Sequence, residues 1–177
     1  ENTPDPFGDP DYYYQLYQLP AGESYQYPES AYGVLAWWDY GYWITRIGHR
    51  PPNANPSQSR EATTKVANFF LSQDEYSATE LIQEMDTAYI IIDYQTTTDK
   101  FWAIITWAGK DVPQFLDLYY LPHEDTVMPV QLFYPEYYRC LSTRLYNFDG
   151  KAVTSPSPVV ISYKEGITQE GEPYKLI

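Results

Sequence analysis

Five consecutive residues, Trp37-Trp38-Asp39-Tyr40-Gly41, carry the clearest chemistry in this sequence. An indole N–H can only donate a hydrogen bond and an ionised aspartate can only accept one, whereas the hydroxyl of serine or threonine does both. Donors from Trp37 and Trp38 and an acceptor from Asp39 could therefore hold such a hydroxyl, and would reject analogues that lack it. Taken alone, the five residues fit aromatic packing better, because tryptophan and tyrosine contribute much of the burial in ordinary cores.

A second pair of candidate residues, Lys100 and Ile104, lies further along the chain. Residues four apart share one face of a helix, so a helix here would present a cation and an apolar group together. On spacing alone, a surface lysine beside a core isoleucine is the simpler interpretation.

Other chemistries have little support. The net charge of −13 opposes binding to nucleic acid. The two histidines are far apart and have no cysteine beside them to complete a zinc shell. The single cysteine, Cys140, is interpreted as a buried helix position rather than a nucleophile. Four acidic residues lack the spacing of a calcium loop and are interpreted as solvated charge. They are Asp111, Asp117, Glu124 and Asp125.

The sequence pattern around these residues predicts an α+β fold, in which a helical core carries the tryptophan motif. Apolar spacing predicts a helix over 57–73, and Ser72 with Glu75 forms a capping box that begins a second helix. Pro135 at a first helical position predicts a third helix over 135–148. The apolar run 101–107 is too short to assign to helix or strand.

A small β-sheet and short C-terminal strands complete the predicted fold. A buried strand is expected over 88–94, and two short strands over 159–163 and 173–177. Residues 33–44 predict a buried helix start or a tight turn around Gly41. No apolar run approaches the roughly 20 residues that span a bilayer.

Together the two loci resemble the soluble C-terminal domain of the catalytic subunit of oligosaccharyltransferase, in its archaeal form. The family signature Trp-Trp-Asp-Tyr-Gly stands unaltered at 37–41. The family's second motif, Asp-x-x-Lys-x-x-x-Met or Ile, aligns on Lys100 and Ile104. The resemblance covers at least residues 31–110, and 134–150 are similar in style.

The second motif departs from the family pattern at one position. Thr97 stands where the motif has aspartate. Asp99 or Asp93 could replace that acid, or this branch of the family could manage without it, and the sequence leaves these alternatives open.

The resemblance implies that the parent protein is a multi-pass membrane enzyme, which moves a glycan from a lipid-linked oligosaccharide to the asparagine of an Asn-x-Ser/Thr sequon. Residues 1–177 are then expected to be a single extracytoplasmic domain, with 1–11 as an extended linker from the missing transmembrane region and 12–18 as a short turn or helix. The Mn or Mg ion and the bond-making residues are expected mainly in that missing part, and none in this fragment.

The resemblance also implies a role for each motif residue. Trp37 and Trp38 donate hydrogen bonds to the sequon hydroxyl, and Asp39 accepts one from it. Ile104 packs on the threonine methyl, which is worth about 0.8 kcal/mol as one buried methyl group. Lys100 belongs to the same acceptor site.

Tyr40 and Gly41 are expected to shape the turn rather than to touch the peptide. Two alternatives remain at this stage. The tyrosine and tryptophan content also suits a free-standing extracellular carbohydrate-binding module, because flat aromatic faces stack on sugar rings. A pure scaffold would use residues 37–39 only for stability.

Overall fold

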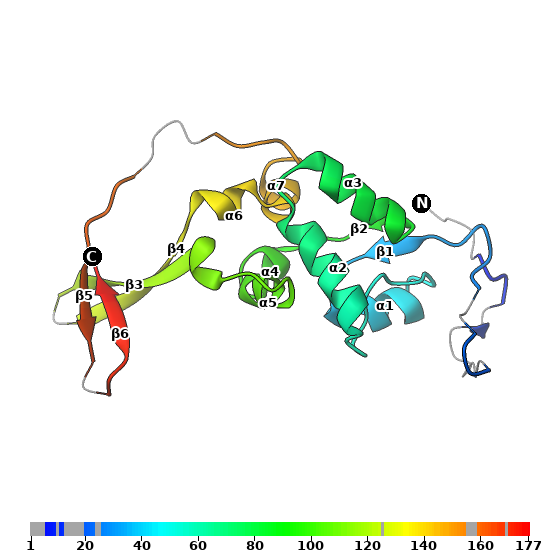
Figure 1. Ribbon diagram of the computed structural model, residues 1–177, viewed down its shortest axis with the longest axis horizontal. Coiled ribbons are helices and arrows are strands. Elements are labelled where there is room, and N and C mark those ends of the chain that lie inside the picture. Colours follow the sequence, from blue (N-terminus) through cyan, green and yellow to red (C-terminus); the bar gives the residue numbers. More distant parts are fainter. Residues whose placement is uncertain are drawn as a thin grey trace.

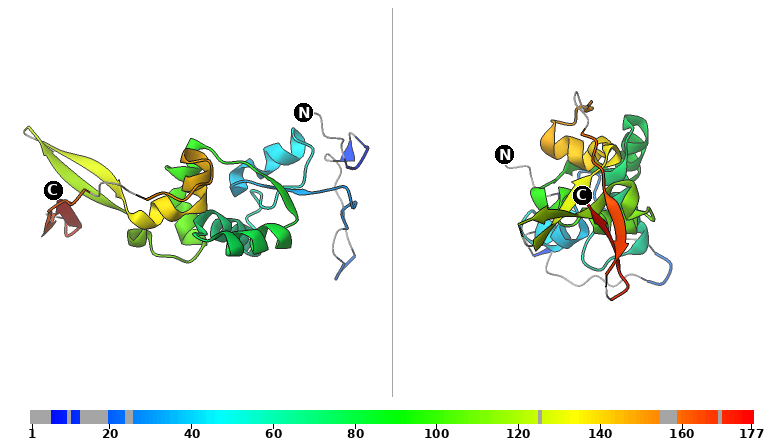
Figure 2. Two further views of the ribbon diagram at one scale, coloured as in Figure 1. Left: turned by 90° about the horizontal axis from the view of Figure 1, so that it is seen from above. Right: turned by 90° about the vertical axis from the view of Figure 1, so that its left-hand side faces the viewer.

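The computed structural model confirms a mixed α+β fold, in which seven helices and two small sheets are assigned among the described residues (Figure 1). The described residues are 6–9, 11–12, 20–23, 26–124, 126–154, 159–168 and 170–177. Residues 13–18 of the expected turn or helix over 12–18, and residues 1–5 and 10 of the expected linker over 1–11, lie outside them. The molecule is elongated, with the N-terminal segment at one end and a four-stranded sheet at the other (Figures 1 and 2).

The helices are short and gather in the middle of the molecule. They are α1 Gly41–Arg46, α2 Arg60–Leu71, α3 Glu75–Glu84, α4 Tyr94–Thr97, α5 Phe101–Trp107, α6 Pro135–Arg139 and α7 Leu141–Asn147. Two 3₁₀ turns, η2 Trp38–Tyr40 and η3 Val112–Gln114, accompany them. Within the described part of the chain, no helix is both long and apolar enough to cross a membrane.

The predicted helices α2 and α3 are confirmed, but the predicted cap is wrong. The side chain of Asp74, rather than Ser72, accepts the backbone N–H of Ser77 at 2.8 Å and caps α3. Ser72 instead ends α2 and its hydroxyl donates to the carbonyl of Asp74. An aspartate one residue before the helix is as good an N-cap as serine, and here it is the residue with the extended backbone that a cap needs.

A parallel strand pair, β1 Gly33–Leu35 and β2 Thr87–Ile90, leads into the two motif regions. The predicted strand over 88–94 ends early, because Asp93 caps the next helix, and the expected burial is wrong, since Tyr89 is 54% exposed. The helix start predicted around Gly41 is confirmed, because α1 begins at this buried glycine, but the prediction for 33–44 missed β1. A three-residue strand followed by a 3₁₀ turn carries too little periodicity to identify.

The core joins α2, α5 and α7 to the start of the tryptophan motif. The unassigned run 101–107 is helix α5, with Phe101, Ile104 and Ile105 completely buried at helical spacing. Its edge-to-face aromatic contacts include Phe101 with Tyr137 at 4.8 Å between ring centroids. The largest fully buried side chains among the described residues include Trp37, Phe69, Phe70, Phe101, Leu35, Ile104 and Ile105.

The predicted helix over 135–148 is interrupted. Cys140 has an extended backbone, with φ −60° and ψ 139°, so α6 ends before it and α7 begins after it. Its side chain is completely buried, as predicted, but it lies at the break rather than within a helix. The break lets the backbone N–H of Leu141 donate to the carbonyl of Ser72, which ties α7 to the end of α2.

The C-terminal sheet has the strand order β4-β3-β6-β5 and includes a hairpin that the sequence analysis missed. The hairpin pairs β3 Leu116–His123 with β4 Thr126–Phe133, and β5 Lys164–Ile167 pairs with β6 Pro173–Leu176. The predicted strand over 173–177 is confirmed, whereas the one over 159–163 is wrong. Val159 and Val160 are 86% and 90% exposed, so their β propensity finds no partner strand.

Candidate functional site

The loop that follows α1 holds the tryptophan motif in place through backbone hydrogen bonds to β1 and a close contact with Gly41. The backbone of Val34 in β1 bonds to the loop on its other side, donating to the carbonyl of Pro51 at 2.9 Å and accepting from the N–H of Asn53 at 3.0 Å. This loop then passes directly beside Gly41, where a Cβ atom would come within 2.5 Å of the carbonyl oxygen of Ala54. Glycine is therefore the residue that lets the loop close over the start of α1.

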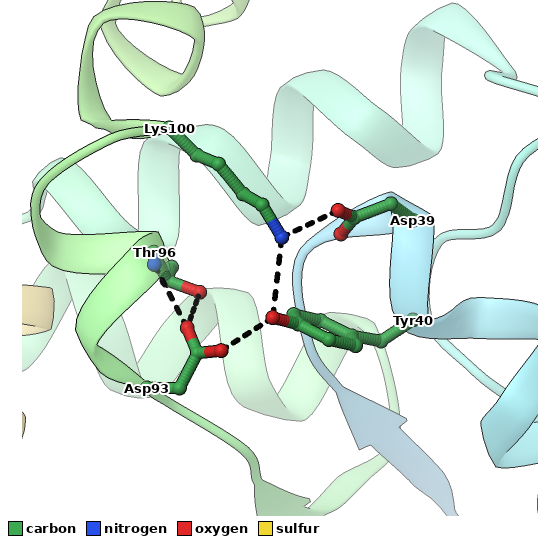
Figure 3. A network of polar contacts seen from close by, with 5 residues as sticks. All are labelled: Asp39, Tyr40, Asp93, Thr96 and Lys100. Atoms are coloured by element: carbon green, nitrogen blue, oxygen red, sulfur yellow. Dashed lines mark hydrogen bonds and ion pairs between the residues drawn. The ribbon is translucent and has the colours of Figure 1, made fainter.

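The two motif regions meet in one polar network (Figure 3). The Lys100 ammonium lies 2.6 Å from Oδ2 of Asp39 and donates to the Tyr40 hydroxyl at 3.1 Å. The Tyr40 hydroxyl in turn donates to Oδ2 of Asp93. Oδ1 of Asp93 accepts from the backbone N–H of Thr96 at 2.8 Å and from its hydroxyl at 2.6 Å. The structure thus brings Asp39 and Lys100 together and adds Tyr40, Asp93 and Thr96 to them.

Local helix starts position the second half of the network. Asp93 is the N-cap of α4, and Lys100 is the N-cap residue of α5. Each residue lies where a short helix begins, so a backbone fixed by helical hydrogen bonds carries its side chain. Lys100 also lies over the Tyr40 ring, with Nζ 4.4 Å from the centroid, which adds a cation–π attraction.

The electrostatics of the network favour its charged form. Burial acts against the charge of Lys100, but bonds to Asp39 and Tyr40 outweigh it, so the pKa of Lys100 is raised. Burial likewise opposes ionisation of Asp93, but hydrogen bonds from Thr96 and Tyr40 leave the pKa of Asp93 lowered. Burial and the bond to Asp93 raise the pKa of Tyr40. At neutral pH the network therefore holds a lysine cation between two carboxylates, with a neutral tyrosine as the bridge.

Two polar atoms of the motif are buried and have no hydrogen-bond partner. They are Nε1 of Trp38, a donor, and Oδ1 of Asp39, an acceptor. Lys100 binds the other oxygen of Asp39, so one oxygen of that carboxylate is committed and one is available. A buried polar group without a partner costs about 1–3 kcal/mol, so a ligand that satisfies both atoms would recover that cost.

Trp37 and Ile104 lie deeper than the other predicted site residues. Trp37 is 2% exposed and Ile104 is completely buried, and both belong to the hydrophobic core. The tilted ring of Trp37 contacts that of Trp38, with 6.3 Å between centroids. In this structure both side chains pack in the core beneath the polar network rather than facing solvent.

The structure places the three residues that bear on the missing motif aspartate in different surroundings. Thr97 is buried, and its hydroxyl donates to backbone carbonyls of α4, at 3.0 Å to Tyr94. Asp99 is exposed, and its Oδ1 accepts from the hydroxyl of the neighbouring Thr98 at 3.4 Å. Asp93 is the acid that enters the network. The pattern Asp93-x-x-Thr96, an N-cap signature at the end of a strand, could have identified both residues from sequence.

The other candidate chemistries find little support in the structure. Burial raises the pKa of the Cys140 thiol to about 12, so the thiolate that a nucleophile needs is not available near neutral pH. Among the described residues, no group of three or more metal-ligating side chains comes together. Asp39 and Asp93 are held by Lys100, Tyr40 and Thr96, so this pair does not fit a divalent cation.

Comparisons with known proteins identify the family of this chain. Residues 1–97 match the family described as the AglB core domain. The chain is 34% identical over 176 residues to the dolichyl-monophosphooligosaccharide–protein glycotransferase AglB of Haloferax volcanii, covering 90% of this chain and 16% of that protein. It is 30% identical over 181 residues to dolichyl-phosphooligosaccharide-protein glycotransferase 3 of Archaeoglobus fulgidus, covering 87% of this chain and 21% of that protein.

The chain is also similar to solved structures of an archaeal oligosaccharyltransferase. A crystal structure of the Archaeoglobus fulgidus oligosaccharyltransferase, tethered to an acceptor peptide containing an NVT sequon, matches with a TM-score of 0.67 and 28% identity over 86% of this chain and 21% of that one. Two further structures of the enzyme from this organism contain Zn and sulfate, or an inhibitory peptide and a dolichol-phosphate. Their TM-scores are 0.66 and 0.64, each at 30% identity over 84% of this chain, and over 22% and 20% of those chains.

Fold and site together define a globular domain homologous to the C-terminal soluble portion of an archaeal oligosaccharyltransferase. The chain belongs to the AglB core domain family. It spans only about a fifth of the length of the curated relatives that it matches.

Proposed function

We propose that this domain recognises the acceptor sequon Asn-x-Ser/Thr for a membrane oligosaccharyltransferase. The observation that carries the proposal is the unpartnered pair of buried atoms, Nε1 of Trp38 and Oδ1 of Asp39. One donor and one acceptor from adjacent residues match a hydroxyl, which needs both. The related enzyme that was crystallised with an NVT peptide makes a threonine hydroxyl the natural ligand.

Recognition would act through hydrogen bonds that only a hydroxyl completes. The serine or threonine oxygen accepts from Trp38, and its O–H donates to Asp39. Trp37 supplies a second indole donor, and because it is 2% exposed, that bond requires the site to open. Ile104 would contact the threonine methyl, and because it is fully buried here, that contact requires the site to open as the peptide binds. Fixing the residue two places after asparagine holds the poorly nucleophilic amide against the donor and lowers the entropic part of the barrier.

The remaining functions belong to the parent protein. We propose that residues 1–177 form one extracytoplasmic domain beside a multi-pass membrane part, which binds the lipid-linked oligosaccharide and the Mn or Mg ion. Related structures of the Archaeoglobus fulgidus enzyme contain Zn or a dolichol-phosphate, which supports a metal ion and a lipid-linked donor as ligands of the parent protein. Asp39 binds Lys100 through one oxygen, and Asp93 binds Tyr40 and Thr96, so this pair is not expected to hold the metal ion, whose ligands are expected mainly in the membrane part.

Asp39→Ala in the full-length enzyme tests the proposal. Transfer to an Asn-x-Thr peptide should fall about 100-fold, since a hydrogen bond to a charged group contributes about 1.5–3 kcal/mol. Binding of the lipid-linked donor should be unchanged. Asp117→Ala is the matched control, because Asp117 also pairs with a lysine, Lys175, but in the C-terminal sheet. Unchanged transfer by Asp39→Ala would contradict the proposal and favour the carbohydrate-binding or scaffold alternatives.

A further inference from the structure

The geometry points to Tyr40 and Asp93 as positioning residues, which hold Lys100 on one oxygen of Asp39 and so keep the other oxygen free for the acceptor hydroxyl. This inference rests on the proposed function and adds to it two residues that do not touch the peptide. It also assigns Asp93 to the place in the site that the second motif of this chain leaves without an aspartate.

An isolated pair of lysine and aspartate would not choose between the two carboxylate oxygens. A lysine ammonium is a compact charge on a flexible four-carbon stem, and it can bind either oxygen or bridge both. In this structure it lies 2.6 Å from Oδ2 of Asp39, while Oδ1 has no partner. Something besides Asp39 must therefore fix where the ammonium lies.

The Tyr40 hydroxyl supplies the second fixed point. It accepts from Lys100 at 3.1 Å, and the Tyr40 ring lies under the ammonium at 4.4 Å. A hydroxyl has a single O–H, and Tyr40 uses it to donate a hydrogen bond to Asp93. Its lone pairs are therefore turned toward Lys100, so Asp93 sets the direction of the bridge (Figure 3).

Asp93 is itself anchored by the helix that it caps. Its Oδ1 accepts both Thr96 bonds, at 2.8 Å from the backbone N–H and 2.6 Å from the hydroxyl, which leaves Oδ2 for Tyr40. Both oxygens of Asp93 are thus used as acceptors. An asparagine at this position has one acceptor oxygen, so it could satisfy Thr96 or Tyr40 but not both.

Tyr40→Phe and Asp93→Asn in the full-length enzyme test the inference. The assay measures transfer to two peptides, Asn-x-Thr and Asn-x-Val, because valine has nearly the shape of threonine without its hydroxyl. In both variants the preference for threonine should fall roughly tenfold, with the KM for the threonine peptide raised more than kcat is lowered. The double variant should be no worse than either single variant, since both break the same chain of contacts.

A purely structural role predicts a different outcome. Loss of folded enzyme lowers transfer to both peptides equally and leaves their ratio unchanged. Tyr119→Phe is the control, because it removes a tyrosine hydroxyl from a 2.8 Å bond to Tyr134 in the C-terminal region. A wild-type threonine preference in Tyr40→Phe and Asp93→Asn would overturn the inference, even if Asp39→Ala had lost that preference and upheld the proposed function. If Asp39→Ala keeps it, the proposed function itself fails.

Discussion

The ion pair between Lys100 and Asp39 leaves the site half satisfied, and this is what distinguishes it from a structural salt bridge. A structural ion pair in a partly buried setting needs its remaining lone pairs satisfied to be stable. Here Oδ1 of Asp39 and Nε1 of Trp38 lack partners, so the folded domain carries a cost that ligand binding can recover. Substitutions that remove these polar atoms are therefore expected to lower transfer without a matching loss of folding stability.

Trp38→Phe is expected to separate the two. Removing an unpartnered N–H offsets the loss of ring area, so the free energy of unfolding should change by less than about 1 kcal/mol. Transfer to an Asn-x-Thr peptide should nevertheless fall at least about tenfold. Denaturant titration and a transfer assay give the two values, and Trp102→Phe is the control, because Trp102 is 58% exposed on the outer face of α5. A large loss of stability with normal transfer would show that Trp38 only packs.

The network should also make stability depend on pH in the acid range. Hydrogen bonds lower the pKa of Asp93 in spite of its burial, so its contribution is present above its unfolded pKa of about 3.9 and is lost as pH falls through the lower folded value. The raised pKa of Lys100 keeps that residue charged throughout this range. The difference in unfolding free energy between wild type and Asp93→Asn should be constant from about pH 5 to 8 and shrink below about pH 4.

Denaturant titrations of both chains between about pH 2.5 and 8 check this dependence. The variant provides its own control, because asparagine does not titrate and all other acids are shared. A difference that stays constant through the acid range would mean that Asp93 is not held by charge-assisted bonds.

At the scale of residues, the sequence indicated most residues of the candidate site but not the hydrogen bonds that connect them. Motif chemistry and resemblance predicted Trp37, Trp38, Asp39, Lys100 and Ile104, and the ion pair shows that Asp39 and Lys100 meet. The binding role of the five residues stays a prediction. The bridge through Tyr40 was not predictable. It depends on Tyr40 in η2 meeting Asp93, the N-cap of α4, across 53 residues of chain, which no local spacing encodes.

At the scale of elements, helices with a clear apolar face were predictable, whereas elements defined by long-range pairing were not. The spacing of Val66, Phe69 and Phe70 identified α2, and all three are completely buried. The β3–β4 hairpin escaped detection because prolines interrupt its pattern. Pro129 is tolerated because β4 is an edge strand, a fact visible only once the sheet is assembled.

The corrected start of α3 gives a direct test at this scale. Asp74→Ala should lower the thermal midpoint by a few degrees, because the backbone N–H of Ser77 loses its acceptor. Ser72→Ala should change it much less, since the Ser72 hydroxyl bonds only to the carbonyl of Asp74. Differential scanning calorimetry of the two variants compares them at one pH. The reverse order of effects would restore the capping box predicted from the sequence.

At the scale of the whole molecule, the polar site and the C-terminal sheet lie in different regions. The sheet projects from the helical body at one end, while the motif region lies among the helices toward the other (Figures 1 and 2). This separation is why Asp117 and Tyr119 serve as controls for Asp39 and Tyr40. Substitutions in the sheet are expected to alter stability without altering the choice of acceptor.

The most direct test of the central claim is the ratio of kcat/KM for Asn-x-Thr over Asn-x-Val peptides, measured with the full-length wild-type enzyme and with Asp39→Ala. The ratio does not depend on the amount of folded enzyme. The wild type should prefer threonine by at least about 100-fold, because valine leaves Trp38 and Asp39 unpaired. In Asp39→Ala that preference should collapse toward tenfold or less. A preference that survives the loss of Asp39 undiminished would contradict hydroxyl recognition by this site.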